Sequence, residues 1–340
     1  MIKTSICDLF GIKYPILQAP MGPFVTTKLA VAVSEAGGLG TISHAGILEE
    51  KDTAIDSVSK MKNDIQVLKK GTKANFALNI RVAKLQLMLD AYKLADMVVD
   101  QVKNDPEVKK RLKAVITSAG DPTLFTKKFK DVGLKVLHVV PTVRHAKKAE
   151  EVGCDAVIAS GYEAGGHVSP TPVHTNVLVP AVADAVKIPV IAAGGFCDGR
   201  GLASALAMGA QGIQMGTRFI NTKECEFHEN YKKKILTAKE TDTEVILGMF
   251  GPARHLINGY VDEQKAMVAK GTPEDSIRSW ELPRWPLAER DGDINKGIML
   301  CGQCSGRVKD IPTVKELITR IMKEAEDTIG KLQKLSTPTK

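Results

Sequence analysis

The sequence has 340 residues, of which 44% are hydrophobic and 25% are charged, as expected of a water-soluble globular protein with a large core. Its net charge of +8 comes from lysines spread along amphipathic segments rather than gathered in one basic stripe, which argues against nucleic-acid binding. A mild positive field instead favours an anionic substrate, a cofactor phosphate or an acidic partner protein. No apolar run approaches the roughly 18–20 residues of a membrane span, and the first residues lack the pattern of a signal peptide.

Six cysteines are scattered along the chain, most of them in apolar surroundings. This pattern fits reduced thiols better than a disulfide framework, so we expect a cytoplasmic protein. Cys301-x-x-Cys304 is accompanied by neither a second C-x-x-C nor a suitably spaced histidine pair. We therefore interpret both thiols as structural and expect no metal site.

Eight short apolar runs recur along the chain, and segments with helical periodicity or many alanines separate them. None of the runs alternates cleanly between apolar and polar residues, which is typical of strands buried on both faces. The runs are Pro15–Pro20, Gly38–Ser43, Ala74–Ile80, Ala114–Gly120, Lys135–Pro141, Ala156–Gly161, Pro189–Gly195 and Gly212–Phe219. Strands that alternate with helices predict parallel crossovers, and eight of them close a (β/α)₈ TIM barrel of the α/β class. A Rossmann fold fits less well, because AGGLGTIS lacks the third glycine of the G-x-G-x-x-G motif.

After about Asn221 this rhythm of buried runs stops, and the sequence predicts helices with no buried strand. We interpret residues 223–296, which contain both tryptophans, as a small helical domain inserted after the eighth strand. The barrel would then comprise residues 1–222 and 297–340, with a closing helix at Ile311–Leu332. Because an insertion at this point emerges on the catalytic face, the small domain should cover the barrel mouth as a lid.

In such barrels the chemistry takes place at the carboxyl ends of the strands. Three features stand there: the loop SGYEAGGHVSP with Glu163 and His167, the turn Gly194–Gly195, and Gly216–Thr217. Glycines after the seventh and eighth strands expose backbone N–H groups that can bind a phosphate. Glu163 could either tune His167 or take a structural role, as a helix cap or in a salt bridge. His44, at the end of the second strand, is a candidate for contact with substrate.

The motifs QAPMG, EAGGLGT, YEAGGH, IPVIAAGGFCDGRG and GIQMGTRF, in this order, resemble the nitronate monooxygenase (2-nitropropane dioxygenase) family of FMN-dependent barrels. That family includes FMN-dependent enoyl-ACP reductase II and NAD(P)H:quinone reductases. The resemblance spans about Ile12–Phe219, and GDINKGIMLCGQCSG extends it near the C-terminus.

The resemblance implies that FMN is the cofactor and that His167 is the catalytic residue beside the flavin. Met21 and Gly22 would border the ring, Asn79 would hydrogen-bond it, and Gln303 would approach from the C-terminal side. Gly194, Gly195, Gly216 and Thr217 would hold the phosphate. The remaining residues that the resemblance places around the cofactor are Pro20, Gly161, Glu163, Gly165, Gly166 and Met215.

Among the family's activities we favour nitronate monooxygenase, which oxidises alkyl nitronates with O₂ to a carbonyl compound and nitrite. The alternatives on the same site are an enoyl-ACP reductase II, which would use NAD(P)H and an acidic acyl carrier protein, and an NAD(P)H:quinone reductase. Some quinone-reductase-like members carry a lysine where this chain has Val139 and Val140. A flavin-free lyase or isomerase is a more distant alternative, because the strand ends lack the paired acid and lysine residues that such chemistry usually needs. A homodimer also stays open.

Overall fold

The computed structural model describes residues 2–22, 25–44, 56–82, 88–249 and 251–336. Its centre is an eight-stranded parallel sheet in the order β1-β9-β8-β6-β5-β4-β3-β2. The two end strands β1 and β2 meet through a parallel bridge between Leu17 and Leu39, which closes the sheet into a barrel. The strands are β1 (Ile16–Gln18), β2 (Gly40–Ile42), β3 (Phe76–Arg81), β4 (Leu112–Ser118), β5 (Lys135–Val140), β6 (Ala156–Ser160), β8 (Val190–Ala193) and β9 (Gly212–Met215). Each lies within or overlaps one of the eight predicted runs, so the prediction of an α/β TIM barrel is confirmed.

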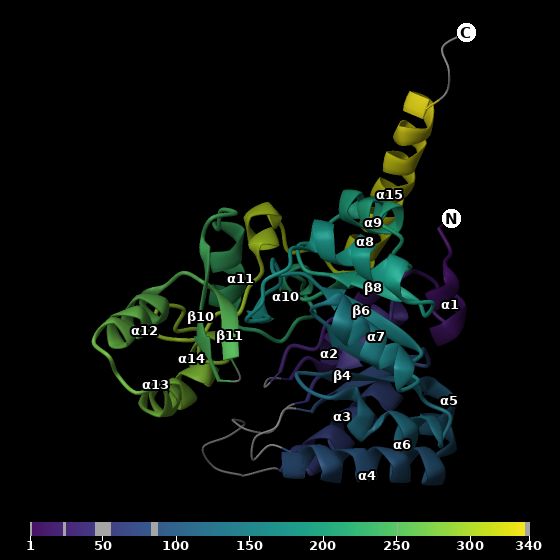
Figure 1. Cartoon of the computed structure of the whole chain (residues 1–340), viewed down its shortest axis with the longest axis horizontal. Coiled ribbons are helices and arrows are strands. Elements are labelled where there is room, and N and C mark those ends of the chain that lie inside the picture. Colours follow the sequence, from purple (N-terminus) through teal and green to yellow (C-terminus); the bar gives the residue numbers. More distant parts are fainter. Residues whose placement is uncertain (1, 23–24, 45–55, 83–87, 250, 337–340) are drawn as a thin grey trace.

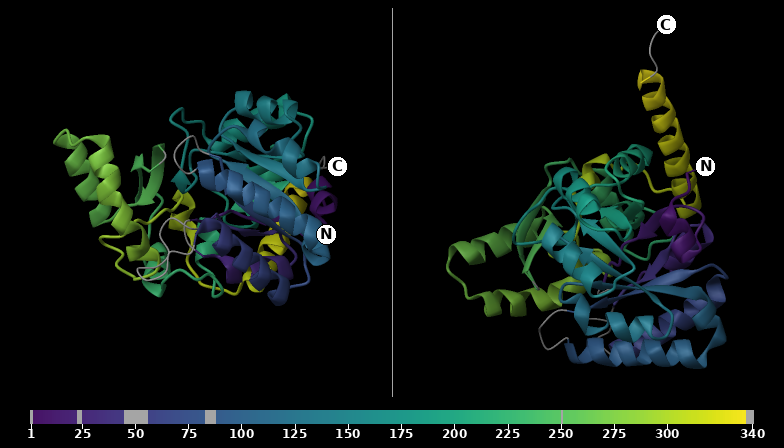
Figure 2. Two further views of the ribbon diagram at one scale, coloured as in Figure 1. Left: turned by 90° about the horizontal axis from the view of Figure 1, so that it is seen from below. Right: turned by 45° about the vertical axis from the view of Figure 1, so that its right-hand side comes forward.

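Helices surround the barrel, as Figure 1 shows. The helices of this ring are α2 (Thr27–Glu35), α3 (Ser57–Gly71), α4 (Met88–Asn104), α5 (Pro106–Arg111), η1 (Pro122–Leu124), α6 (Thr126–Lys130), α7 (Val143–Glu151), α8 (Thr175–Ala185), α9 (Gly199–Ala207), the short α10 (Thr217–Ile220) and α15 (Val314–Ser336). Three of them, α3, α5 and α9, follow a capping carboxylate: Asp56, Asp105 and Asp198 each accept hydrogen bonds from backbone N–H groups of the helix that follows. The closing helix α15 packs against α9 and α2, and its C-terminal end extends beyond the barrel (Figures 1 and 2). None of the described helices is long and apolar enough to cross a membrane.

Alternate residues of each strand point to two separate cores. One core fills the space between strands and helices and includes Leu78 and Ile80 of β3. The other fills the barrel lumen and includes Ala77 of β3. Helix α1 (Ser5–Phe10) adds Ile6 and Phe10 to the lumen core, so it closes the amino-terminal end of the barrel. The carboxyl ends of the strands therefore form the other end, where a site can lie.

Residues 223–296 contain the predicted helices α11 (Glu229–Leu236), α12 (Gly259–Ala269), α13 (Glu274–Glu281), η2 (Leu282–Arg284) and α14 (Trp285–Glu289). The prediction of helices alone is wrong, because this segment also contains the antiparallel strands β10 (Thr243–Gly248) and β11 (Gly251–Leu256). We call residues 223–296 the lobe. Most of β10 is only half-buried, and its apolar run, Val245–Leu247, is short. The lobe has a small core of its own, which contains Tyr260, Val261 and Trp285. Ile298, just beyond the expected boundary at residue 296, belongs to the same core.

The lobe meets the barrel at the loop that follows β6. Strand β7 (Gly166–His167) pairs with β11, with His167 opposite Ala253 and Gly166 opposite Arg254. Figures 1 and 2 show the lobe and α1 at opposite ends of the barrel. The lobe thus stands at the carboxyl ends of the strands, while its function as a lid stays a prediction.

Candidate active site at the carboxyl ends of the strands

The ends of β1, β2 and β9 converge on the segment Pro20–Met21–Gly22. The Met21 N–H donates to Ser43 Oγ at 2.8 Å. A Cβ added to Gly216 would lie 3.7 Å from Met21 Sδ, and one added to Gly22 would lie 2.5 Å from the His44 carbonyl oxygen. The residues that follow β1 therefore lie beside those that follow β2 and β9. Met215, in contrast, is buried in the core between barrel and helices.

The turn after β8 consists of two glycines with left-handed backbone conformations, Gly194 at φ +94° and Gly195 at φ +85°. A Cβ on Gly194 would lie 2.8 Å from the Gly161 carbonyl oxygen, so packing alone requires glycine there. Among the described residues, a Cβ on Gly195 would meet only Glu163 Cβ, at 3.7 Å. The side of Gly195 is consequently open enough to receive a ligand.

The loop between β6 and β7 is packed against two other segments, which explains its small residues. A Cβ on Gly161 would lie 1.9 Å from Thr175 Oγ1, and one on Gly165 would lie 2.5 Å from Gly302 N. The Glu163 carboxylate accepts from the backbone N–H and the hydroxyl of Thr175, at 3.0 and 2.8 Å. Glu163 thus caps the amino terminus of α8, the second of the two roles considered for it.

The C-terminal segment Cys301–Gln303 crosses this loop and the end of β9. The Gln303 N–H donates to the Glu163 carbonyl at 3.0 Å. The Gly302 N–H donates to the Thr217 hydroxyl at 2.9 Å. Gln303 therefore lies beside the predicted site, and Thr217 already accepts one hydrogen bond from the chain.

His167 lies on β7 at the contact between barrel and lobe. A Cβ on Gly248 of β10 would lie 3.4 Å from His167 Nε2, so the lobe hairpin passes close to the ring. The His167 side chain keeps exposed surface although protein surrounds it on most sides. Desolvation, followed by the positive charge of Arg81, lowers the pKa of His167 to about 4. His167 is therefore neutral at neutral pH, which suits it to accept a proton or a hydrogen bond.

His44 and Arg81 meet at the ends of β2 and β3. The buried His44 accepts the backbone N–H of Arg81 on Nδ1 at 3.2 Å. Desolvation and then the charge of Arg81 lower the pKa of His44 to about 3. His44 is thus neutral and its Nδ1 is engaged by the chain.

Asn79 precedes Arg81 by two residues on β3. The Asn79 amide nitrogen donates to the Ile116 carbonyl at 2.8 Å and to Ser118 Oγ at 3.1 Å. These bonds orient the side chain and leave Oδ1 as the atom that can accept a further hydrogen bond. Asn79 is therefore held in a fixed position at the strand end.

Two arginines of this region were not predicted from the sequence. Arg81 is the last residue of β3, one position beyond the predicted apolar run, and the strand-end rule would have found it had the run been extended. Arg254 of β11 donates from Nη2 to the Tyr162 carbonyl at 2.9 Å and from Nη1 to Thr243 Oγ1 at 3.1 Å. Arg254 therefore ties the lobe to the start of the loop, a contact that no sequence pattern indicates.

The thiols of Cys301 and Cys304 face different partners. Cys301 Sγ lies 3.8 Å from the Tyr231 hydroxyl, while Cys304 is hydrogen-bonded to Cys197. Burial raises the pKa of Cys301 to about 12, so its thiol stays protonated. Within the described part of the chain, no three His, Cys, Asp or Glu side chains are grouped so as to hold a metal ion.

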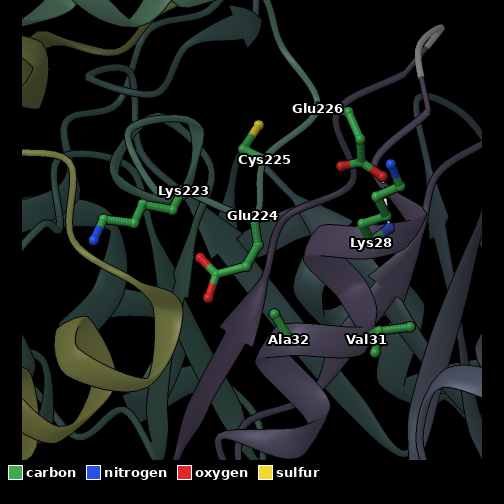
Figure 3. A pocket seen from close by; sticks show the side chains of 7 residues that line it. All are labelled: Lys28, Val31, Ala32, Lys223, Glu224, Cys225 and Glu226. Atoms are coloured by element: carbon green, nitrogen blue, oxygen red, sulfur yellow. Dashed lines mark hydrogen bonds between the residues drawn. The ribbon is translucent and has the colours of Figure 1, made fainter.

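Two cavities are lined by none of the residues predicted to bind the cofactor. One, of about 360 Å³, lies between α2 and residues 223–226 (Figure 3). Glu226 beside it accepts the Lys28 backbone N–H at 2.6 Å and caps α2. The other, of about 350 Å³, is lined by charged residues that include Arg218 and Asp310, which form an ion pair at 2.6 Å. Glu226 in the first cavity and the Arg218–Asp310 pair in the second are thus engaged within the protein.

Known proteins resemble this chain over most of its length. A protein from Rhodococcus jostii described as (3aS,4S,5R,7aS)-5-hydroxy-7a-methyl-1-oxo-octahydro-1H-indene-4-carboxyl-CoA dehydrogenase is 28% identical, covering 97% of this chain and 98% of its own. A probable nitronate monooxygenase from Staphylococcus saprophyticus is 34% identical, covering 77% of this chain and 82% of its own.

Solved structures agree with these sequence comparisons. FabK from Thermotoga maritima superimposes with a TM-score of 0.87 at 35% identity, covering 98% of this chain and all of that one. A nitroalkane oxidase from Streptomyces ansochromogenes superimposes with a TM-score of 0.80 at 25% identity, covering 97% of this chain. The family model for nitronate monooxygenase matches residues 3–324. The chain therefore belongs to the nitronate monooxygenase family, a family of oxidoreductases.

Proposed function

We propose that this protein is an FMN-dependent nitronate monooxygenase, which oxidises alkyl nitronates with O₂ to a carbonyl compound and nitrite. The observation that supports this most is the placement of a neutral His167 at the carboxyl ends of the strands, within the loop packed beside the open Gly194–Gly195 turn. Membership of the family supports the same class of reaction.

The residues present fit an FMN. The open side of Gly195 and its left-handed backbone suit a phosphate bound by backbone N–H groups, with Gly216 facing it from the next strand. Met21 and Gly22 would border the ring, Asn79 Oδ1 would accept a hydrogen bond from it, and Gln303 would close its far side. Among the other predicted cofactor neighbours, Gly161 and Glu163 contact α8, and Gly165 and Thr217 contact residues 301–303, so these residues would shape the backbone around the cofactor. When bound, FMN supplies the redox chemistry.

The side chains of the protein would bind and orient the substrate. A nitronate is already an anion, so no base has to remove a proton from its carbon. A neutral His167 can accept a hydrogen bond or a proton without repelling or attracting the charge of the substrate. If a neutral nitroalkane binds instead, the same imidazole could remove its α-proton.

A thioester reductase or dehydrogenase is the second candidate, because the relative from Rhodococcus jostii is described as a carboxyl-CoA dehydrogenase. Anaerobic mixing separates the two candidates. An alkyl nitronate should bleach the flavin rapidly, whereas NADH and NADPH should do so slowly. Rapid bleaching by either nicotinamide, with reoxidation by an enoyl thioester or a quinone, would transfer the assignment to a reductase. Purified protein that stays colourless after FMN is added would exclude flavin chemistry altogether.

The lowered pKa of His167 leads to a prediction about pH. A histidine in water titrates near about 6.5, whereas His167 should stay neutral until the pH approaches about 4. The NMR signals of isotopically labelled histidine, assigned to His167 by their loss in the His167→Ala variant, should therefore show a midpoint below about 5. Steps that need the neutral imidazole should keep their rate as the pH falls from 8 to about 6. A midpoint near about 6.5 would mean that the site does not desolvate the ring.

A further inference from the structure

Arg81 lies at the mouth of the barrel and was given no role in the reaction proposed above. Side chains of a strand alternate between two faces, and Ala77 of β3 points into the lumen while Leu78 and Ile80 point outward. Asn79 and Arg81 share the lumen face with Ala77, and Arg81 is the last residue of the strand. Its side chain therefore stands at the carboxyl end of the barrel.

The surroundings of Arg81 place it beside the proposed flavin site. A Cβ on Gly22 would lie 3.7 Å from Arg81 Nη1, so the guanidinium group adjoins the turn after β1. The Arg81 backbone N–H is bound by His44 Nδ1 at 3.2 Å, which fixes the end of β3 against the end of β2. The group is thus anchored through its backbone close to the turn that would border the ring.

His44, His167 and Arg81 differ in their charge at neutral pH. The positive charge of Arg81 contributes to lowering the pKa of both His44 and His167, so both imidazoles are neutral at neutral pH. Desolvation lowers the pKa of Arg81 itself only to about 10, and the guanidinium group stays charged. Of these three side chains, Arg81 alone carries a positive charge when a substrate binds at neutral pH.

We propose that Arg81 binds the planar, two-oxygen anionic group of the substrate, which is the nitronate group in the proposed reaction, and so selects the anion over the neutral nitroalkane. A nitronate has two oxygens in one plane, like a carboxylate, and the guanidinium group presents paired N–H donors that match this geometry. Their attraction is stronger in a desolvated site than in water. Arg81 supplies the charge, and His167 remains the neutral group near the reacting carbon.

The inference rests on the proposed function, and binding of a simple anion tests it separately from turnover. Acetate serves as a carboxylate analogue of the nitronate group, and its Kd is measured from the perturbed absorbance of the bound flavin and by calorimetry. Arg81→Met should raise the Kd of acetate and the KM of an alkyl nitronate by about 10- to 100-fold, the effect of a lost charge-assisted hydrogen-bond pair. The KM of the neutral nitroalkane and the FMN content should stay unchanged.

Two further variants serve as controls. Arg144→Met removes the same charge from an exposed position on α7 and should leave the Kd of acetate and the KM of the nitronate as in the wild type. Arg81→Lys keeps the charge but not the paired donors, so it should raise both constants less than Arg81→Met does. If Arg81→Met does not fold, Arg81→Lys still tests the proposal, because an unchanged Kd of acetate and an unchanged KM of the nitronate in this variant would overturn it.

The other outcomes are equally distinct. Unchanged acetate affinity in a folded, FMN-containing Arg81→Met protein overturns the proposal, as does loss of FMN, which would assign Arg81 to the cofactor. If acetate binding depends on Arg81 but no nitronate reduces the flavin, the proposed function fails and the anion site stands.

Discussion

Replacing His167 with alanine should lower turnover by roughly 10²- to 10⁴-fold, the usual cost of losing an acid–base group, while FMN remains bound. Alanine keeps the backbone of β7, so the pairing of residue 167 with Ala253 and the contact between barrel and lobe should survive. The proposed phosphate and ring contacts involve other residues, so the FMN content should match that of the wild type. Turnover is measured with the substrate that reduces the flavin fastest, and FMN content by absorbance after gel filtration.

His145→Ala is the matched control for this variant. It removes an imidazole from α7, a helix of the outer ring, where His145 Nδ1 forms a 2.7 Å hydrogen bond with Thr142 Oγ1. Turnover in this control should be that of the wild type. If His167→Ala were as active as His145→Ala, His167 would be a structural residue of the loop and no longer a catalytic candidate.

Gly195→Val should abolish retention of FMN in a protein that still folds. Within the part of the chain that the structure describes, Glu163 Cβ at 3.7 Å is the only atom within 4 Å of an added Cβ, so the new side chain would enter the open space proposed for the phosphate. Its left-handed backbone, at φ +85°, adds a strain of about 1–2 kcal/mol that a stable barrel should tolerate. FMN per protein chain is measured after gel filtration, and folding by circular dichroism and thermal melting.

Gly133→Val separates the effect of strain from the effect of blocking. Gly133 has the same φ of +85°, and an added Cβ there would meet nothing within 4 Å. It lies in the turn before β5, at the amino-terminal end of that strand. This control should lose similar stability and keep its FMN. Normal FMN content in Gly195→Val would place the phosphate elsewhere, whatever happens to the control.

The sequence alone was sufficient for the barrel. Strands buried on both faces must be apolar throughout, so each appears as a short continuous run, such as Ala156–Gly161, and eight such runs with helices between them match one common architecture. The hairpin of β10 and β11 left a weaker signal. Most of β10 is half-buried and its apolar run, Val245–Leu247, is short, while β11 is mostly buried but contains Pro252, Arg254 and His255. Strand β11 is also completed by β7, which lies about eighty residues earlier in the chain. Pairing between distant segments depends on the folded arrangement and leaves no local periodicity.

The candidate site likewise has some features that follow from the sequence and others that depend on the folded arrangement. The sequence determined which residue types stand at the strand ends, because that placement follows from the order of strands along the chain. Only the tertiary structure decided what surrounds them. Gly161 and Gly165 are small because Thr175 and Gly302 pack against them, and Glu163 is occupied by the end of α8. Desolvation, and then the charge of Arg81, lowers the pKa of His167, since a pKa depends on burial and on charges brought near from other strands.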